Sequence, residues 1–433
     1  MRRFHKYFYA YEDAFFLFNH ERSSMINSAD TVFVLLCAAL VMLMTPGLAL
    51  FYGGMVRRKN VLSVLMQCFF ALCLLSVQWM LFGYSLSFAP SNGFWGGFAW
   101  AGLNGVGMEP YAAYSSTIPH QAFMIFQAMF AVITPALIVG AFAERMKFSS
   151  FIVFTLLWAT FVYAPVCHWV WGSGGWLKQL GVLDFAGGIV VHTTAGIAAL
   201  ITAVIIGKRK ELEHTPSPHN LPFVAIGTGL LWFGWFGFNA GSALAANGVA
   251  VNAFITTNMA AAAAGLSWAI LEWIRNGKPT VFGIMTGMIA GLATVTPGAG
   301  FVSPMSALAI GLLASIVCFI GVALIKPRFN YDDTLDAFGV HGIGGILGTI
   351  MVGLFASKSI NSAGADGLFF GGDVHQLLIQ LLGVGVVVLY TASATWIIYK
   401  FIDIFWGVRV KENEEFIGLD LTQHRERAYT IIE

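Results

Sequence analysis

The sequence predicts an all-α integral membrane protein with eleven transmembrane helices. Hydrophobic residues make up 58% of its 433 residues and charged residues only 10%, a composition that excludes an ordinary soluble protein. Apolar stretches of about twenty residues recur along the chain, and each is long enough to cross the hydrocarbon core of a bilayer. The expected spans are residues 31–52, 62–85, 119–142, 148–167, 186–207, 222–242, 252–274, 280–297, 303–325, 338–356 and 374–400.

The connections between these spans predict the orientation. Lys and Arg follow every odd-numbered span up to the ninth, whereas the even-numbered connections carry only Lys178 and Lys358. Positively charged loops are retained on the cytoplasmic side. We therefore expect the N-terminus outside and the C-terminus inside. The basic loop residues are Arg57, Arg58, Lys59, Arg145, Lys147, Lys208, Arg209, Lys210, Arg275, Lys278, Lys326 and Arg328.

Most loops are short, so the chain divides into one membrane domain and two tails. Residues 1–26 form an N-terminal extension whose four basic residues conflict with an outside location. The extension lacks the apolar core and cleavage site of a signal peptide, and Met25 is an alternative start. Residues 27–406 form the membrane domain. Residues 407–433 form a cytoplasmic tail that is polar but keeps an apolar set, namely Phe416, Ile417, Leu419 and Leu421.

Spans 1–5 and 6–10 are expected to be inverted repeats. Two halves with an odd number of spans have opposite orientations, as in many transporters. The fifth span begins Asp184-Phe-x-Gly and reaches His192, and the tenth begins Asp336-x-Phe-Gly-x-His341. The eleventh span lies outside the repeat. Asp184 and Asp336 are expected to cap helix N-termini.

His192 and His341 lie inside long apolar stretches. An ionisable side chain at membrane depth is costly and usually faces a cavity or a pathway. One such histidine alone is more often hydrogen-bonded structure than function, but two at equivalent places favour a shared pore. Other ligands with metal-site spacing do not accompany them, so no metal site is expected. Glu144 beside Arg145 is expected to form an interfacial ion pair.

Aromatic residues recur at helical spacing near one end of the predicted bundle. Phe126 and Phe130 are four residues apart and share a helix face. Core packing or an interfacial belt is the simpler explanation for any one ring. The alternative is a cage for a small cation, built of rings and a hydroxyl. Its members would be Phe126, Phe130, Trp171, Trp235, Phe238 and Ser242.

Composition argues against other classes of function. The five cysteines show no metal-ligand or redox spacing, so they are expected to pack as small hydrophobes. A net charge of +1 gives no indication of nucleic-acid binding. No nucleophile or metal set accompanies the histidines, which disfavours an enzyme, and no cofactor is expected.

Five motifs identify the chain as resembling the ammonium transporter, methylammonium permease and Rhesus family. They are Thr45-PGLALFYGGM-55 with Lys59-NVLS-63, Asp184-FAGGIVVH-192, Gly234-WFGFNAGS-242, Asp336-AFGVH-341 and the tail pattern Glu415-FIGLD followed by His424-x-Glu-Arg-Ala-Tyr429. The pairing of Trp171 with Ser242 is similar to the bacterial-type ammonium transporter branch rather than the Rhesus branch. The loop after Trp171 carries one residue more than the usual pattern, which affects the rim.

The resemblance implies roles for individual residues. Phe126, Phe130, Trp171 and Ser242 would bind ammonium or methylammonium outside the pore. Phe130 and Phe238 would form the gate, and His192 and His341 would line the pore. Asp184 would support cation recruitment, and Tyr163 and Trp235 would form the vestibule wall.

The resemblance also implies partners and a mechanism. The chain would be a homotrimer in the inner cell membrane, its tail packed under the neighbouring subunit. A PII-type nitrogen regulator would dock near Lys208–Lys210. NH₄⁺ would lose its proton at the gate and cross as NH₃, with or without separate proton transfer. The alternatives are an ammonium sensor, which usually carries an added signalling domain, and a Rhesus-type neutral gas channel.

Overall fold

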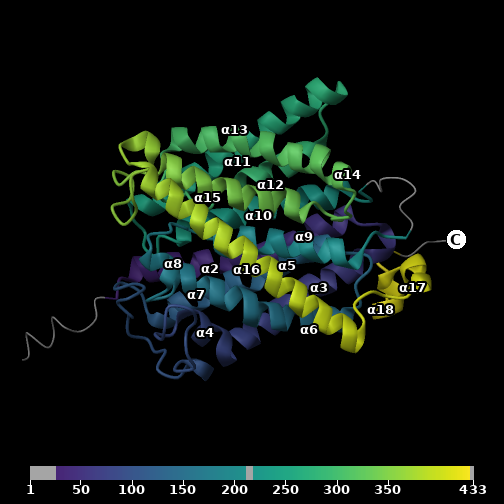
Figure 1. Cartoon of the computed structure of the whole chain (residues 1–433), viewed down its shortest axis with the longest axis horizontal. Coiled ribbons are helices and arrows are strands. Elements are labelled where there is room, and N and C mark those ends of the chain that lie inside the picture. The colour runs from purple at the N-terminus through teal and green to yellow at the C-terminus, as the bar shows by residue number, and fades with distance from the viewer. Residues whose placement is uncertain (1–25, 211–217, 430–433) are drawn as a thin grey trace, which may run out of the picture.

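The computed structural model describes residues 26–210 and 218–429, and this part of the chain is a bundle of helices that share one approximate direction (Figure 1). No β-strand occurs among the described residues, and an isolated bridge pairs Met146 with Arg409. The predicted all-α class is therefore confirmed. The expectations for residues 1–24 and for Met25 lie outside the described residues.

The first half contains five helical segments, two of them interrupted by π-helical turns. They are α2 (Ser28–Met55), α3 (Val61–Gln78) with η2 (Trp79–Gly83) and α4 (Tyr84–Phe88), α5 (His120–Phe142), α6 (Phe148–Trp158) with η4 (Ala159–Tyr163) and α7 (Ala164–Trp171), and η5 (Gly188–Thr193) with α9 (Thr194–Ile206). Short helices η1 (Arg58–Asn60), η3 (Ala101–Leu103) and α8 (Trp176–Gln179) lie in the connections.

The second half repeats this arrangement. Its segments are α10 (Leu221–Gly241), α11 (Gly248–Asn276), α12 (Val281–Val295), α13 (Pro304–Ile320) with η6 (Gly321–Ile325) and α14 (Lys326–Phe329), and η7 (Phe338–Gly342) with α15 (Ile343–Phe355). After η8 (Leu368–Phe370), the long α16 (Val374–Trp406) crosses the bundle diagonally (Figure 1). The tail forms α17 (Glu412–Ile417) and α18 (Leu419–His424).

Ten of these helical segments are long and apolar enough to cross a membrane. At the position expected for the eighth span lies α12, a shorter apolar helix of 15 residues. It ends just before Pro297, which cannot continue the hydrogen-bonding of a helix. Ten candidate spans thus match ten of the eleven expected ones.

Four of the five π-helical turns in the described residues occupy matching places in the two halves, whereas η2 has no counterpart in α11. The fourth segment of each half contains one, η4 and η6, and the fifth segment of each half begins with one, η5 and η7. His192 lies in η5 and His341 in η7. A π-helical turn adds a residue to the helix and is often found at functional sites.

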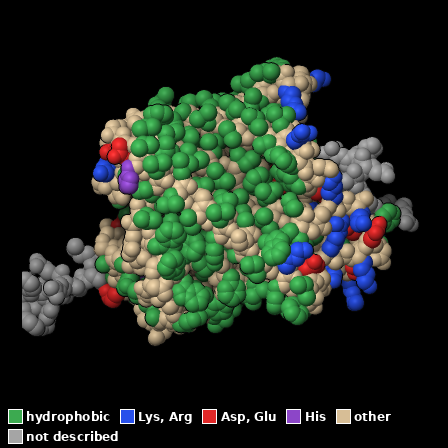
Figure 2. Space-filling model, in the orientation of Figure 1, with side chains coloured by type: hydrophobic (Ala, Val, Ile, Leu, Met, Phe, Trp, Pro, Cys, Tyr) green, Lys and Arg blue, Asp and Glu red, His purple; other side chains and the backbone are tan. Residues whose placement is uncertain are grey.

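Charged side chains gather at the end of the bundle that carries α14, α17 and α18, which we call the basic end. Figure 2 shows Lys and Arg concentrated there, beside a broad hydrophobic band over the middle of the molecule. Several helices expose large apolar side chains, among them Leu36 on α2, Phe233 on α10 and Leu389 on α16. Such a band suits contact with lipid.

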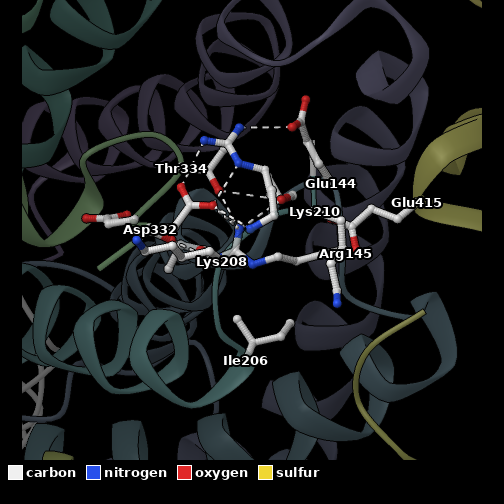
Figure 3. Close-up of polar contacts among 12 residues, drawn as sticks. Glu144, Arg145, Ile206, Lys208, Lys210, Asp332, Thr334 and Glu415 are labelled. Carbon is white, nitrogen blue, oxygen red and sulfur yellow. Dashed lines mark hydrogen bonds and ion pairs between the residues drawn. The ribbon is translucent and has the colours of Figure 1, made fainter. Parts of the chain in front are cut away.

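A buried ion network connects four loops at the basic end (Figure 3). The Glu144 carboxylate pairs at 2.9 Å with both Arg57 and Arg209, and Arg209 also binds Asp332 at 2.9 Å. Arg145 donates instead to Thr334 Oγ1 and lies 3.8 Å from Asp332. The expected pair of Glu144 with Arg145 is therefore wrong, because these sequence neighbours bind different partners. Glu144 also has a left-handed φ of 74°, which is uncommon for a residue other than glycine.

The tail is folded against its own chain. Glu415 is buried, pairs with Arg409 at 2.9 Å and accepts a hydrogen bond from the Lys210 backbone N–H. Asp420 accepts from the Ser63 N–H at the start of α3. Of the predicted apolar set, Leu419 is buried, whereas Phe416, Ile417 and Leu421 are exposed in the single chain.

Candidate functional site

A cavity of about 510 Å³, here called the outer cavity, lies at the end of the bundle opposite the basic end. Trp171 from the end of α7 and Ser242 just after α10 both line it, together with Asp184 from the loop before η5. The Trp171 indole N–H donates to the backbone oxygen of Asp184 at 2.8 Å, which fixes the ring at the cavity wall. Residues far apart in the sequence thus meet in one cavity.

Aromatic rings lead inward from this cavity in an unbroken series. Phe130 contacts Trp171 edge to face at 5.8 Å between ring centroids, and Phe126 at 5.0 Å. Phe130 then packs on Phe238 at 4.4 Å. Both phenylalanines are almost fully buried, with exposed fractions of 0% and 1%. The two rings therefore lie between Trp171, which lines the outer cavity, and the interior of the bundle.

A second, central cavity lies beyond Phe238. Its volume of about 10 Å³ is close to what a single water-sized molecule requires. His192, His341, Trp235 and Phe238 line it, together with aliphatic and aromatic side chains including Leu48, Phe51, Ile133, Leu137, Val191, Leu231 and Ile289. Its wall carries no carboxylate. The central cavity is thus apolar except for two imidazoles.

The two imidazoles are nearly parallel, with ring centroids 5.2 Å apart and planes 15° apart. His192 also stacks on Trp235 at 5.4 Å and on Phe238 at 5.9 Å. Three of their ring nitrogens, Nδ1 and Nε2 of His192 and Nδ1 of His341, are buried without a hydrogen-bond partner among the described residues. Buried polar atoms are usually paired. These nitrogens are therefore available to a small polar molecule.

Glycines bring the two histidine-bearing segments into backbone contact. A Cβ added to Gly196, four residues after His192, would lie 2.1 Å from Gly342 Cα. A Cβ added to Gly345, four residues after His341, would lie 2.7 Å from the Thr193 backbone nitrogen. Each helix thus presents a glycine to the residue that follows the other histidine. Only glycine permits this approach, and the approach sets the distance between the imidazoles.

A buried aspartate caps each of these segments. Both Asp184 carboxylate oxygens accept hydrogen bonds from backbone N–H groups, those of Gly187, Gly188, Ile189 and Val190. Burial raises the pKa of Asp184, while these four bonds act to lower it. At η7 the Phe338 N–H donates to Asp333 at 2.8 Å.

The expected cap at Asp336 is therefore wrong. Its carboxylate pairs with Lys326 Nζ at 2.6 Å, and its φ of 58° is left-handed. The sequence motif aligned Asp336 with Asp184, but Asp333 is the aspartate that, like Asp184, precedes its histidine by eight residues.

Two residues expected at the vestibule wall differ in position. Trp235 lines the central cavity, and its indole N–H donates to Thr296 Oγ1 at 2.9 Å. Tyr163 lies in η4, is 1% exposed and packs on Trp79 at 6.3 Å. It is not among the residues lining either cavity. Gln127, which sequence reasoning did not select, lines the outer cavity. Its signal was a single amide one residue after Phe126.

Comparisons with known proteins agree with this geometry. Residues 32–429 match the profile of the Ammonium Transporter Family. The ammonium transporter of Bacillus subtilis (strain 168) is 55% identical over 404 residues, which cover 93% of this chain and 99% of the relative.

The chain belongs to the Ammonium Transporter Family.

Solved structures share the fold. The crystal structure of Candida albicans Mep2 superposes with a TM-score of 0.86 at 36% identity, covering 93% of this chain and 91% of Mep2. A structure described as a sensor Amt protein superposes with a TM-score of 0.83 at 32% identity, covering 92% and 98%. The predicted resemblance is confirmed: the chain is a multi-pass membrane protein of a transporter family.

Proposed function

We propose that the chain conducts ammonium by binding NH₄⁺ in the outer cavity and passing NH₃ along His192 and His341. At the Phe130–Phe238 constriction NH₄⁺ would give its proton either to water on the outer side or to a separate transfer along the two imidazoles. The observation that carries this proposal is the change of environment across the constriction. A wide cavity with polar groups lies outside it, and a cavity of about 10 Å³ with no carboxylate lies inside it.

Charge transfer across this boundary would be costly. Moving an unpaired cation from water into an apolar interior is so unfavourable that the group usually becomes neutral instead. NH₃ is neutral, fits a space for one water-sized molecule, and has one lone pair and three N–H groups. The free ring nitrogens of the two histidines can donate to it or accept from it, according to their tautomers.

Recruitment outside the constriction would rest on four side chains. The rings of Phe126, Phe130 and Trp171 offer cation–π contact. The Ser242 hydroxyl donates to the Phe238 carbonyl at 2.9 Å, so its lone pairs remain available to accept an N–H. Asp184 would act indirectly, because its carboxylate is occupied by the backbone.

The membrane arrangement forms part of the proposal. The concentration of Lys and Arg at the basic end supports a cytoplasmic location for that end (Figure 2), with the N-terminus outside. The short α12 would complete an eleventh crossing. The matching π-helical turns and glycine contacts support an inverted repeat. Inner-membrane location and a homotrimer follow from the resemblance.

We also propose residues 27–406 as the transport domain and 407–433 as a regulatory tail. A PII-type regulator would contact Lys210, whose side chain is 53% exposed, rather than Arg209, which is buried in the ion network.

Uptake of radiolabelled methylammonium into proteoliposomes tests the transport proposal. We expect saturable uptake that ammonium inhibits. Likeness to the sensor Amt protein makes a sensor the second candidate. A sensor would bind ammonium with little flux, so binding without uptake would favour it. Uptake that rises with NH₃ alone and never saturates would instead favour a Rhesus-type gas channel.

A further inference from the structure

Gln127 carries an amide that the protein does not satisfy. It lies on α5 and is 9% exposed, and its Oε1 is buried without a hydrogen-bond partner among the described residues. Among the described residues, its Nε2 likewise makes no hydrogen bond to a side chain or to the backbone. Buried amides without partners are uncommon in native proteins and call for an explanation.

The position of Gln127 supplies one. Phe123 precedes it by four residues and Phe130 follows it by three, so the three side chains share one face of α5. Gln127 and Phe123 both line the outer cavity, and Phe130, which we propose closes the passage, follows one helical turn further along α5. The amide therefore stands at the cavity wall, one helical turn outside the closing ring.

A second glutamine in the same wall, Gln376, has an amide that is hydrogen-bonded to the protein and so serves a structural role. Gln376 also lines the outer cavity, but its Nε2 donates to the Gly181 carbonyl at 3.1 Å and lies 3.3 Å from Gln380 Oε1. Gln376 thus connects α16 to the loop before η5. Gln127 makes no such connection and remains free to meet a donor that enters the cavity.

We propose that Gln127 is a further specificity-determining residue of the outer site, whose amide oxygen accepts an N–H from ammonium held above Phe130. The inference rests on the proposed outer site. Rotation of the amide about its terminal bond directs the oxygen to the cavity. Together with Ser242 it would offer two oxygen acceptors at the rim of a set of aromatic faces.

This combination would favour ammonium over K⁺. Ammonium has four N–H donors at tetrahedral angles and can use two oxygens and the ring faces at once. K⁺ requires a ring of oxygens that replaces its hydration shell, and two acceptors do not provide one. Methylammonium, with one donor fewer, would lose part of the same interaction.

The test compares two replacements that separate binding from packing. Gln127→Leu removes the acceptor and keeps the approximate volume, whereas Gln127→Glu keeps an acceptor and adds negative charge. For binding we expect Gln127→Leu to raise the half-saturating ammonium concentration about tenfold, the loss typical of one hydrogen bond to a charged group. Gln127→Glu should lower it and let K⁺ compete. A packing role predicts the opposite order, because a buried carboxylate destabilises more than leucine.

Controls make each outcome decisive. Gln121→Leu, on the same helix, removes a hydrogen bond to the Val106 carbonyl but lies outside the cavity wall, and should leave half-saturation unchanged. If Trp171→Leu raises half-saturation and Gln127→Leu does not, the inference is wrong and the outer site stands. If neither changes it, the outer site itself is wrong. Should Gln127→Leu fail to reach the membrane, Gln127→Met provides the same loss of acceptor.

Discussion

Asp184 and Asp333 each lie eight residues before a histidine of the central cavity, and each accepts hydrogen bonds from the first N–H groups of the segment that carries that histidine. The two caps differ in completeness. Asp184 engages both oxygens, whereas Asp333 Oδ1 is buried without a partner among the described residues. An aspartate thus caps both histidine-bearing segments, but the cap at the basic end has one carboxylate oxygen without a partner among the described residues.

Replacing Asp333 should change how stability depends on pH. Burial raises the pKa of its carboxyl from 3.8 to about 6, with Lys326 opposing and Asp336 adding to the rise. The folded state therefore holds the proton more tightly than the unfolded state. The stability gained by protonation is present below pH 3.8 and is lost as the pH rises through about 6.

Asp333→Asn should remove that dependence and melt a few degrees higher than the wild type at pH 7. The melting temperature of both proteins, measured in detergent at several pH values between 4 and 7, tests this expectation. Asp373→Asn, at an exposed N-cap where asparagine serves equally well, is the control. An identical pH profile for wild type and Asp333→Asn would contradict the expectation.

The histidine pair should respond non-additively to replacement. His192→Ala or His341→Ala leaves one imidazole facing an enlarged apolar cavity, so the two losses are coupled. We expect the double variant to abolish selective methylammonium uptake or to convert it to leaky cation passage. Uptake and membrane current in proteoliposomes measure both outcomes. His375→Ala, at an exposed site, should behave as wild type, and a double variant with normal selectivity would exclude the pore proposed here.

The outer site should control selectivity rather than folding. Trp171→Leu and Ser242→Ala remove a ring face and an acceptor at a partly exposed wall, so both should fold normally. We expect weaker discrimination of NH₄⁺ from other cations, with half-saturation raised several-fold. Competition between ammonium and methylammonium provides the measurement, and Trp396→Leu, at an exposed position on α16, provides the control. Unchanged competition in both variants would argue against this site.

Glu144 should be among the most sensitive residues at the basic end. Burial alone would raise its pKa, but the Arg209 and Arg57 cations lower it below its usual value. Glu144→Gln leaves buried Arg209 with one carboxylate fewer, and we expect a loss of about 3 kcal/mol or more. The exposed pair Lys210–Glu412 offers the contrast, since Glu412→Gln should change stability by less than about 1 kcal/mol. Comparable melting temperatures for the two variants would contradict this.

Removing the tail should impair transport more than folding. A chain cut after Trp406 loses Glu415, Leu419 and the Asp420 cap on α3, but none of the residues lining the central cavity. We expect a folded trimer with sharply reduced or uncoordinated uptake. Glu415→Ala, which breaks only the contacts with Arg409 and Lys210, should reproduce part of the loss. Full uptake at matched membrane levels would show the tail to be dispensable.

Periodicity and composition were enough to predict the helices, because a membrane span must satisfy its backbone internally and expose apolar side chains. The apolar stretches around His192 and His341 also predicted that both side chains face a cavity, and both line the central cavity. The prediction was less successful where spatial contacts were inferred from residues that are close together in the sequence. Asp336 was expected to be a cap because its motif resembled that of Asp184, and Glu144 was paired with its neighbour Arg145. The ion-pair partners of Glu144 and Arg209 are 65 or more residues away in the sequence, so no local pattern could reveal them.

The backbone contacts at Gly196 and Gly345 have a consequence for how the family could vary. The backbones of the two segments touch there because glycine has no side chain. The distance between the two imidazoles is therefore set by these glycines and not by how the neighbouring side chains pack. Lining residues such as Leu231 or Ile289 could be exchanged while the calibre stays constant. A single methyl group at either glycine would instead move two whole helices. The residues that line the central cavity would thus determine its chemistry, whereas Gly196 and Gly345 would determine its width.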